Sequence, residues 1–130
     1  MAESVALMML RAASHDVAAC QALAAAPGIA DTVIGFHAQQ ACEKCLKAVL
    51  SAAGIEFART HDLVRLMDLV DAGGIEFPAQ ARWLDELNPY AVEARYGLVE
   101  PGRLDHLRVL TMIDQLLEWA GERSDSAGRT

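Results

Sequence analysis

The chain has 130 residues, which is the length of a single domain that can bury a hydrophobic core without disulfides. Hydrophobic residues make up 53% of it and aromatic residues only 5%, which excludes a disordered chain and, with many alanines, favours packed helices over a β-sheet. The net charge of −7 excludes a protein that contacts nucleic acid over its whole surface, because phosphate contact needs basic surface. Any such contact has to be a local basic patch.

Prolines, glycines and capping residues divide the chain into helical segments. The first predicted helix stops at Pro27-Gly28, and the second takes Asp31 or Thr32 as its N-cap. Thr60 reads as the N-cap of the third helix, and Asn88-Pro89 interrupts the fourth. The predicted helices span residues 2–26, 31–53, 60–73, 78–87 and 101–122, with a helical turn or two over residues 90–96. Residues 123–130 form a polar tail that is expected to be disordered.

Export and membrane signals are missing from the sequence. The apolar run at residues 5–10 has no basic region before it and no cleavage site after it. No segment approaches the roughly 20 apolar residues that a membrane-spanning helix needs. The three cysteines are an odd number, which fits a reducing compartment better than a disulfide framework. The sequence therefore predicts a cytoplasmic protein.

Residues 31–53 carry the most informative pattern. Their small apolar side chains gather on one wide arc at helical spacing, which predicts close contact with neighbouring helices at the centre of a bundle. The opposite arc is polar and includes Glu43 and Lys47, a well-oriented i,i+4 pair. From spacing alone, an ordinary solvated face is a better interpretation of this arc than a binding surface. Its members are Gln39, Gln40, Glu43, Lys44, Lys47 and Ser51.

The spacing Cys42-x-x-Cys45 suggests redox chemistry or a metal, but its context favours neither. Both sulfurs fall on the apolar arc in the middle of a helix, whereas a redox pair works best near a helix N-terminus. A structural zinc site needs four ligands, and only the isolated histidines His15 and His37 could complete one. Buried free thiols are the better interpretation, and neither a metal site nor a cofactor is predicted.

Two histidines are candidates for acid–base chemistry. His61 lies between the predicted cap Thr60 and Asp62, so a carboxylate could orient its ring as a general base, although a capping role is more common. His106 follows Arg103 by three residues on the same helix face, where a solvated role is the simpler interpretation. The sequence contains no Ser/His/Asp arrangement, glycine-rich phosphate loop or metal motif.

Three segments together form a fairly specific pattern. They are FHAQQACEKCLKAVL at residues 36–50, THDL at 60–63 and ARY at 94–96, with Gly54 and Tyr90 between them. On these residues the chain resembles the HEPN family, the small helical domains named for higher eukaryotes and prokaryotes nucleotide-binding. The resemblance covers most of the chain. It implies an all-α, up-and-down antiparallel bundle of about four or five helices over residues 1–122, and usually a homodimer.

The resemblance also has implications for activity and partners. Proteins of the family often work with a minimal nucleotidyltransferase encoded beside them, as a toxin–antitoxin or related pair, and some are metal-independent ribonucleases. The ribonucleases carry an arginine followed, after a spacer of about four to six residues, by a histidine. Arg95 matches the arginine, but the positions for the histidine hold Glu100, Pro101 and Gly102. The chain therefore resembles the Arg-Tyr branch of the family, and this implies a non-catalytic protein.

The resemblance also suggests a site for nucleotide or RNA. Arg95 could hold a phosphate, and Tyr96 or Tyr90 could stack on a base. Positive charge and polar groups would come from the helix that holds residues 31–53, with His61 at the rim. The candidate binding residues are Gln40, Glu43, Lys44, Lys47, His61, Tyr90, Arg95 and Tyr96. The alternative is a buried polar network of Gln40, Glu43, His61 and Arg95 that holds the bundle together.

Three hypotheses follow from the sequence. The first is a non-catalytic, dimeric HEPN module that pairs with a nucleotidyltransferase and contacts nucleotide or RNA. The second is a metal-independent ribonuclease in which His61 or His106 replaces the usual base beside Arg95. The third is a purely structural interaction bundle, since a shared fold does not by itself carry a function.

Overall fold

Helices account for the secondary structure of the chain. The computed structural model describes residues 4–92, 96–97 and 102–127, and for residues 126 and 127 only the backbone. Within these ranges it has no strand, and its helices are α1 (Val5–Ala25), α2 (Asp31–Ala52), α3 (Leu63–Ala72), the 3₁₀ helix η1 (Ala79–Tyr90) and α4 (His106–Ala127). The prediction of an all-α bundle is confirmed. None of the helices in this part of the chain is long and apolar enough to cross a membrane.

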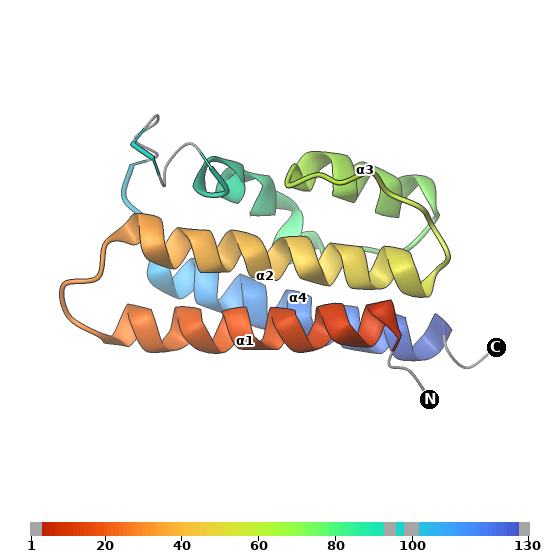
Figure 1. The fold of residues 1–130 in the computed structure, drawn as a ribbon, viewed down its shortest axis with the longest axis horizontal. Coiled ribbons are helices and arrows are strands. Elements are labelled where there is room, and N and C mark those ends of the chain that lie inside the picture. The colour runs from red at the N-terminus through yellow and green to blue at the C-terminus, as the bar shows by residue number, and fades with distance from the viewer. Residues whose placement is uncertain (1–3, 93–95, 98–101, 128–130) are drawn as a thin grey trace.

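Helix α2 lies at the centre of the bundle (Figure 1). Helices α1 and α4 pack against it and against each other, and α3 and η1 cover another side, so that α2 contacts every other helix. The colours of Figure 1 show that α1 runs antiparallel to both α2 and α4. Alanine, cysteine and leucine supply most of the side chains in the core, in keeping with the low aromatic content.

The polar arc of α2 is not the solvated face that its spacing predicts. Apart from Val33, every residue of α2 is buried or half-buried. Gln39 is fully buried, and Glu43 is only 5% exposed. The reason is the position of α3 and η1, which cover the side of α2 that α1 and α4 leave open. The polar residues of α2 therefore have to find partners inside the protein.

The N-terminal caps of two helices differ from the sequence prediction. Asp62, not Thr60, is the N-cap of α3, and its carboxylate accepts the N–H of Val64 at 3.0 Å. The Thr60 hydroxyl supports this turn by accepting the N–H of Asp62 at 3.0 Å. The N-cap of α2 is Ala30, which has no side-chain acceptor, so Asp31 is the first helical residue rather than the cap. Its carboxylate instead binds Leu104 and His106, which lie just before and at the start of α4.

The segment between α3 and α4 also differs from the prediction. The fourth helix does not stop at Asn88-Pro89, because η1 continues to Tyr90. The Asn88 side chain explains this continuation, since it donates to Asp62 at 3.0 Å and accepts the N–H of Leu63 at 2.8 Å, which holds η1 against the start of α3. The helical turns expected over residues 90–96 lie partly outside the described residues.

Helix α4 begins and ends later than predicted. It starts at His106, not near residue 101, because the Asp105 carboxylate caps it by accepting the N–H of Arg108 at 3.1 Å. It continues to Ala127, so residues 123–127 are helical where a disordered tail was expected. No proline or glycine interrupts the sequence between residues 122 and 127, and Arg123 forms an ion pair with Glu76 at 3.3 Å. Residues 128–130 lie outside the described residues.

The three cysteines are buried free thiols, which confirms their interpretation from the sequence. Burial raises the pKa of Cys20 and of Cys45 to about 12, and the negative charge of Asp16 adds to both increases. Burial likewise raises the pKa of Cys42 well above its usual range. Because the thiolate is the reactive form, these side chains are packing groups and not a redox pair.

We expect that no cysteine of the native protein reacts within minutes with a thiol reagent such as dithiobis(nitrobenzoate) at pH 8. In 6 M guanidinium, about three thiols per chain should react at once, because unfolding exposes them and returns each pKa toward about 8.5. Absorbance at equal protein concentration in the two solutions checks this. Rapid reaction of even one thiol in the native protein would contradict the burial of the cysteines.

Candidate functional site

Glu43 is the hub of a polar network on α2. One oxygen of its carboxylate, Oε1, lies 2.7 Å from Nδ1 of His61, and the other, Oε2, accepts from Nζ of Lys47 at 3.1 Å. The amide of Gln39 donates to the same carboxylate at 3.4 Å and to the backbone carbonyl of His61 at 2.9 Å. Gln40 joins the network by donating to Oε1 of Gln39 at 2.8 Å. The segment before α3 is thereby tied to α2.

A second cluster joins α1 to α2. Asp16 of α1 has an 11% exposed side chain, and its carboxylate accepts from Nζ of Lys44 at 2.5 Å. The other carboxylate oxygen lies 3.0 Å from Nδ1 of His37. Each lysine of the predicted binding face is therefore held by a carboxylate within the protein. Lys47 is only 13% exposed and Lys44 is 26% exposed, so neither ammonium group is presented openly to a ligand.

This arrangement matches the alternative that the sequence left open, a polar network inside the bundle. Three of its four expected members, Gln40, Glu43 and His61, are linked by hydrogen bonds. The fourth, Arg95, lies outside the described residues. Buried groups paired in this way satisfy one another and fix which helices pack together, because a mismatched packing would leave a buried charge without a partner.

His61 is the accessible end of this network. Its side chain is 64% exposed, although the carboxylate that binds it is 6% exposed. When Nδ1 of the ring donates its proton to Glu43, the other ring nitrogen, Nε2, becomes the proton acceptor. An imidazole that a buried carboxylate orients in this way can act as a general base toward a group that approaches from solvent.

The two tyrosines of the predicted site lie in different environments. Tyr90 is 3% exposed, and its ring packs so closely on Gly35 that a Cβ atom there would lie 2.2 Å from the ring. Burial and the charge of Asp31 raise the pKa of Tyr90. Its ring is therefore part of the core and is not presented to a base. Tyr96 is 69% exposed.

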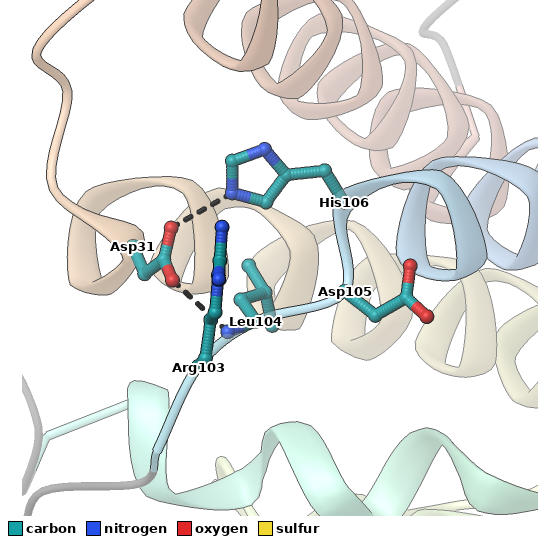
Figure 2. A pocket seen from close by; sticks show the side chains of 5 residues that line it. All are labelled: Asp31, Arg103, Leu104, Asp105 and His106. Atoms are coloured by element: carbon teal, nitrogen blue, oxygen red, sulfur yellow. Dashed lines mark hydrogen bonds and ion pairs between the residues drawn. The ribbon is translucent and has the colours of Figure 1, made fainter.

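His106, the other candidate base, lines a pocket of about 530 Å³ where the starts of α2 and α4 meet. Its ring nitrogen Nε2 lies 2.7 Å from Oδ1 of Asp31, and Oδ2 of Asp31 accepts the N–H of Leu104 at 2.9 Å (Figure 2). These two bonds lower the pKa of Asp31, and the bond from Leu104 has the larger effect. Asp31 thus holds the segment before α4 against α2.

The sequence alone does not reveal the link made by Asp31. Its partners Leu104 and His106 follow it by more than 70 residues, so no local pattern connects them. Among the described residues, no group of three or more histidines, cysteines and acidic residues could hold a metal ion. The described site consists of paired carboxylates, lysines and histidines.

The comparison with known families is decisive for the ancestry of the chain. The model of the HEPN domain family matches residues 6–123, which is most of the chain. The chain belongs to the HEPN family. A search of curated proteins and a search of solved structures each found no match.

Two of the segments that suggested HEPN membership, residues 36–50 and 60–63, contribute to the two polar clusters. In this HEPN chain, the segments 36–50 and 60–63 supply every member of the network around Glu43. They also supply His37 and Lys44, and Asp16 completes that cluster from α1. Asp16, His37 and Gln39 were absent from the predicted site. Gln39 lay on the polar arc, but its complete burial follows only from the position of α3 and η1.

The link through Asp31 makes a prediction for pH dependence. A lowered pKa in the folded state means that ionised Asp31 stabilises the protein above the unfolded pKa of about 3.9, and that this contribution disappears as the pH falls through the lower folded value. We therefore expect Asp31→Asn to lower the urea midpoint at pH 7 and to have a much smaller effect near pH 3. Asp85→Asn, at an exposed position, serves as the control. An equal effect of Asp31→Asn at both pH values would contradict the prediction.

Proposed function

We propose that this HEPN protein is a non-catalytic, dimeric module that works with a minimal nucleotidyltransferase partner in a toxin–antitoxin-like pair. The observation that carries the proposal is that Lys44 and Lys47 are both bound to carboxylates inside the bundle. A surface that held RNA would need these cations to face the phosphates. The polar face of α2 is better suited to fixing one bundle geometry, and a fixed geometry is what a protein partner recognises.

The overall charge supports a protein partner over a long RNA. The net charge is −7, and counterion release, which drives most RNA binding, needs several unpaired basic side chains together. The identity of the partner rests on the HEPN family, whose members often work with a nucleotidyltransferase. Direct contact with nucleotide or RNA is confined in this proposal to Arg95 and the exposed Tyr96.

Exposed apolar side chains at the start of α1 support a contact between chains. Val5, Leu7 and Met8 are about half exposed, at 51%, 50% and 48%. Val5 also lines a shallow hollow of about 500 Å³ together with Ile55 and Phe57. Val5 and Met8 are three residues apart and so share a face of α1, and exposed apolar side chains that share a face are typical of protein interfaces. We place the dimer contact at this end of the bundle.

Light scattering after size-exclusion chromatography tests both parts of the proposal. Alone, the chain should have twice its 14.0 kDa mass, and Met8→Lys should reduce it to the monomer mass. Leu107→Lys is the matched control, because Leu107 is 77% exposed at the start of α4 and should leave the dimer intact. Co-expressed with the nucleotidyltransferase encoded beside it, the chain should elute as one complex of fixed stoichiometry. Separate elution of the two proteins, or a genome with no such neighbouring gene, would contradict the proposal.

A metal-independent ribonuclease is the second candidate function, and one observation favours it. His61 and His106 each lie 2.7 Å from a carboxylate, as an oriented general base requires. Incubation of total RNA with the wild type, Arg95→Ala, His61→Asn and His106→Asn distinguishes the two functions. Cleavage that disappears in Arg95→Ala and in one histidine variant would overturn the non-catalytic proposal. RNA that stays intact with the wild type would rule out the ribonuclease.

A further inference from the structure

The pocket between the starts of α2 and α4 has a polar lining that the proposed non-catalytic function does not use. Its volume is about 530 Å³, and its lining consists of Asp31, Arg103, Leu104, Asp105 and His106. Small-molecule sites usually lie between about 300 and 1,000 Å³, so the space suits a small organic ligand. Arg103 and His106 extend to the same side of the Asp31 carboxylate, whereas Asp105 points away from them (Figure 2).

Both carboxylates of this pocket have partners within the protein. Each oxygen of Asp31 binds one group, Oδ1 the ring of His106 and Oδ2 the N–H of Leu104. Asp105 accepts the N–H of Arg108 and so caps α4. These bonds fix the positions of both carboxylates.

The pocket also contains hydrogen-bond donors that can reach a ligand. Arg103 is exposed, and its positive charge acts on Asp31, although no hydrogen bond or ion pair joins its guanidinium to another group in the described part of the chain. A guanidinium offers five N–H donors in a planar fork that fits two oxygens of one phosphate. When Nε2 of His106 donates to Asp31 and the ring is protonated, the other ring nitrogen, Nδ1, can donate to an anion.

We propose that this pocket binds a phosphate monoester, with Arg103 and His106 donating to the phosphate oxygens and Asp31 acting as the positioning residue for His106. Leu104 forms an apolar wall, and the rest of the volume accommodates the organic group attached to the phosphate. The site shares no residue with the network around Glu43 or with the apolar start of α1. It goes beyond the proposed function, and either proposal can fail without the other.

Calorimetric titration of the whole chain with ribose 5-phosphate, and separately with inorganic phosphate, tests this site. Arg103→Gln should weaken binding of both probes at least tenfold, because it removes the charge and the bidentate donor pair. Arg82→Gln is the matched control, since Arg82 is also exposed but already holds Asp71 through two bonds of 2.8 and 2.9 Å. It should leave the affinity unchanged. Tighter binding of ribose 5-phosphate than of phosphate identifies the ester as the ligand, and equal binding identifies the phosphate group alone.

Nuclear magnetic resonance of the histidine rings gives a second readout that does not depend on a variant. Addition of ribose 5-phosphate should shift the ring nitrogen signals of His106, while the signals of the exposed His15 on α1 stay in place. The proposal would be overturned if the titration produced no heat and the His106 signals did not shift. An equal loss of affinity in Arg82→Gln and Arg103→Gln would also overturn it, because that result would show general electrostatic attraction instead of a built site.

Discussion

Replacing Glu43 with alanine should destabilise the protein by about 3–5 kcal/mol, the usual cost of removing one partner from a buried ion pair. The carboxylate is 6% exposed and bonds to three side chains. Its loss leaves the ammonium group of Lys47, which is 13% exposed, without its counter-charge. It also leaves the fully buried amide of Gln39 with fewer acceptors. Urea denaturation followed by circular dichroism, at one fixed protein concentration, measures this free energy.

Two further substitutions separate charge from size in this experiment. Glu43→Gln keeps the shape of the side chain and one acceptor oxygen, so its cost should fall between those of the wild type and the alanine variant. Glu118→Ala removes an exposed glutamate from α4 and should change the free energy of unfolding by less than about 0.5 kcal/mol. A cost for Glu43→Ala as small as that of Glu118→Ala would show that the network around Glu43 does not stabilise the fold.

Gly35→Ala is expected to destabilise the protein by about 1–3 kcal/mol, although alanine favours a helix by up to about 1 kcal/mol over glycine. A Cβ atom at Gly35 would lie 2.2 Å from the ring of Tyr90, which is far closer than carbon atoms can approach. Because Tyr90 is 3% exposed, its ring cannot move without disturbing the core where η1 meets α2. The free energy of unfolding from urea titration checks the value.

The cause of this effect can be isolated with two controls. Gly121→Ala lies in α4 with no atom within 4 Å of the added Cβ, so it should stabilise the protein by about 0.5–1 kcal/mol. In a Tyr90→Ala background, Gly35→Ala should lose its cost, because the ring that it strikes is gone. Persistence of the full cost in that background would mean that the contact with Tyr90 is not the reason for glycine at this position.

The sequence predicted the helices well because their signals are local. Pro27-Gly28, Gly54 and Gly73-Gly74 lie at helix ends, and the small apolar arc of residues 31–53 correctly placed that helix at the centre of the bundle. The errors at helix starts have one physical cause. Asp31, Thr60 and Asp62 are all capping residue types, and which of them caps a helix depends on tertiary bonds such as those of Asn88 and Leu104.

The candidate site was harder to predict because burial is not a local property. The positions of Glu43 and Lys47 on one helix face follow from their spacing, but that spacing cannot distinguish a solvated pair from a buried one. The covering by α3 and η1 decides between these two, and it also brings His61 to Glu43. The link from Asp31 to His106 joins residues that no local pattern relates.

The coupling free energy between Glu43 and Lys47 tests most directly whether the polar face of α2 holds the bundle together or holds a ligand. Unfolding free energies of the wild type, Glu43→Gln, Lys47→Met and the double variant supply this value. We predict that Lys47→Met costs at least about 1 kcal/mol less when Glu43 is already glutamine, because the ion pair at 3.1 Å is then absent. Additive effects, within about 0.5 kcal/mol, would mean that the two side chains act independently and that Lys47 is available for another partner.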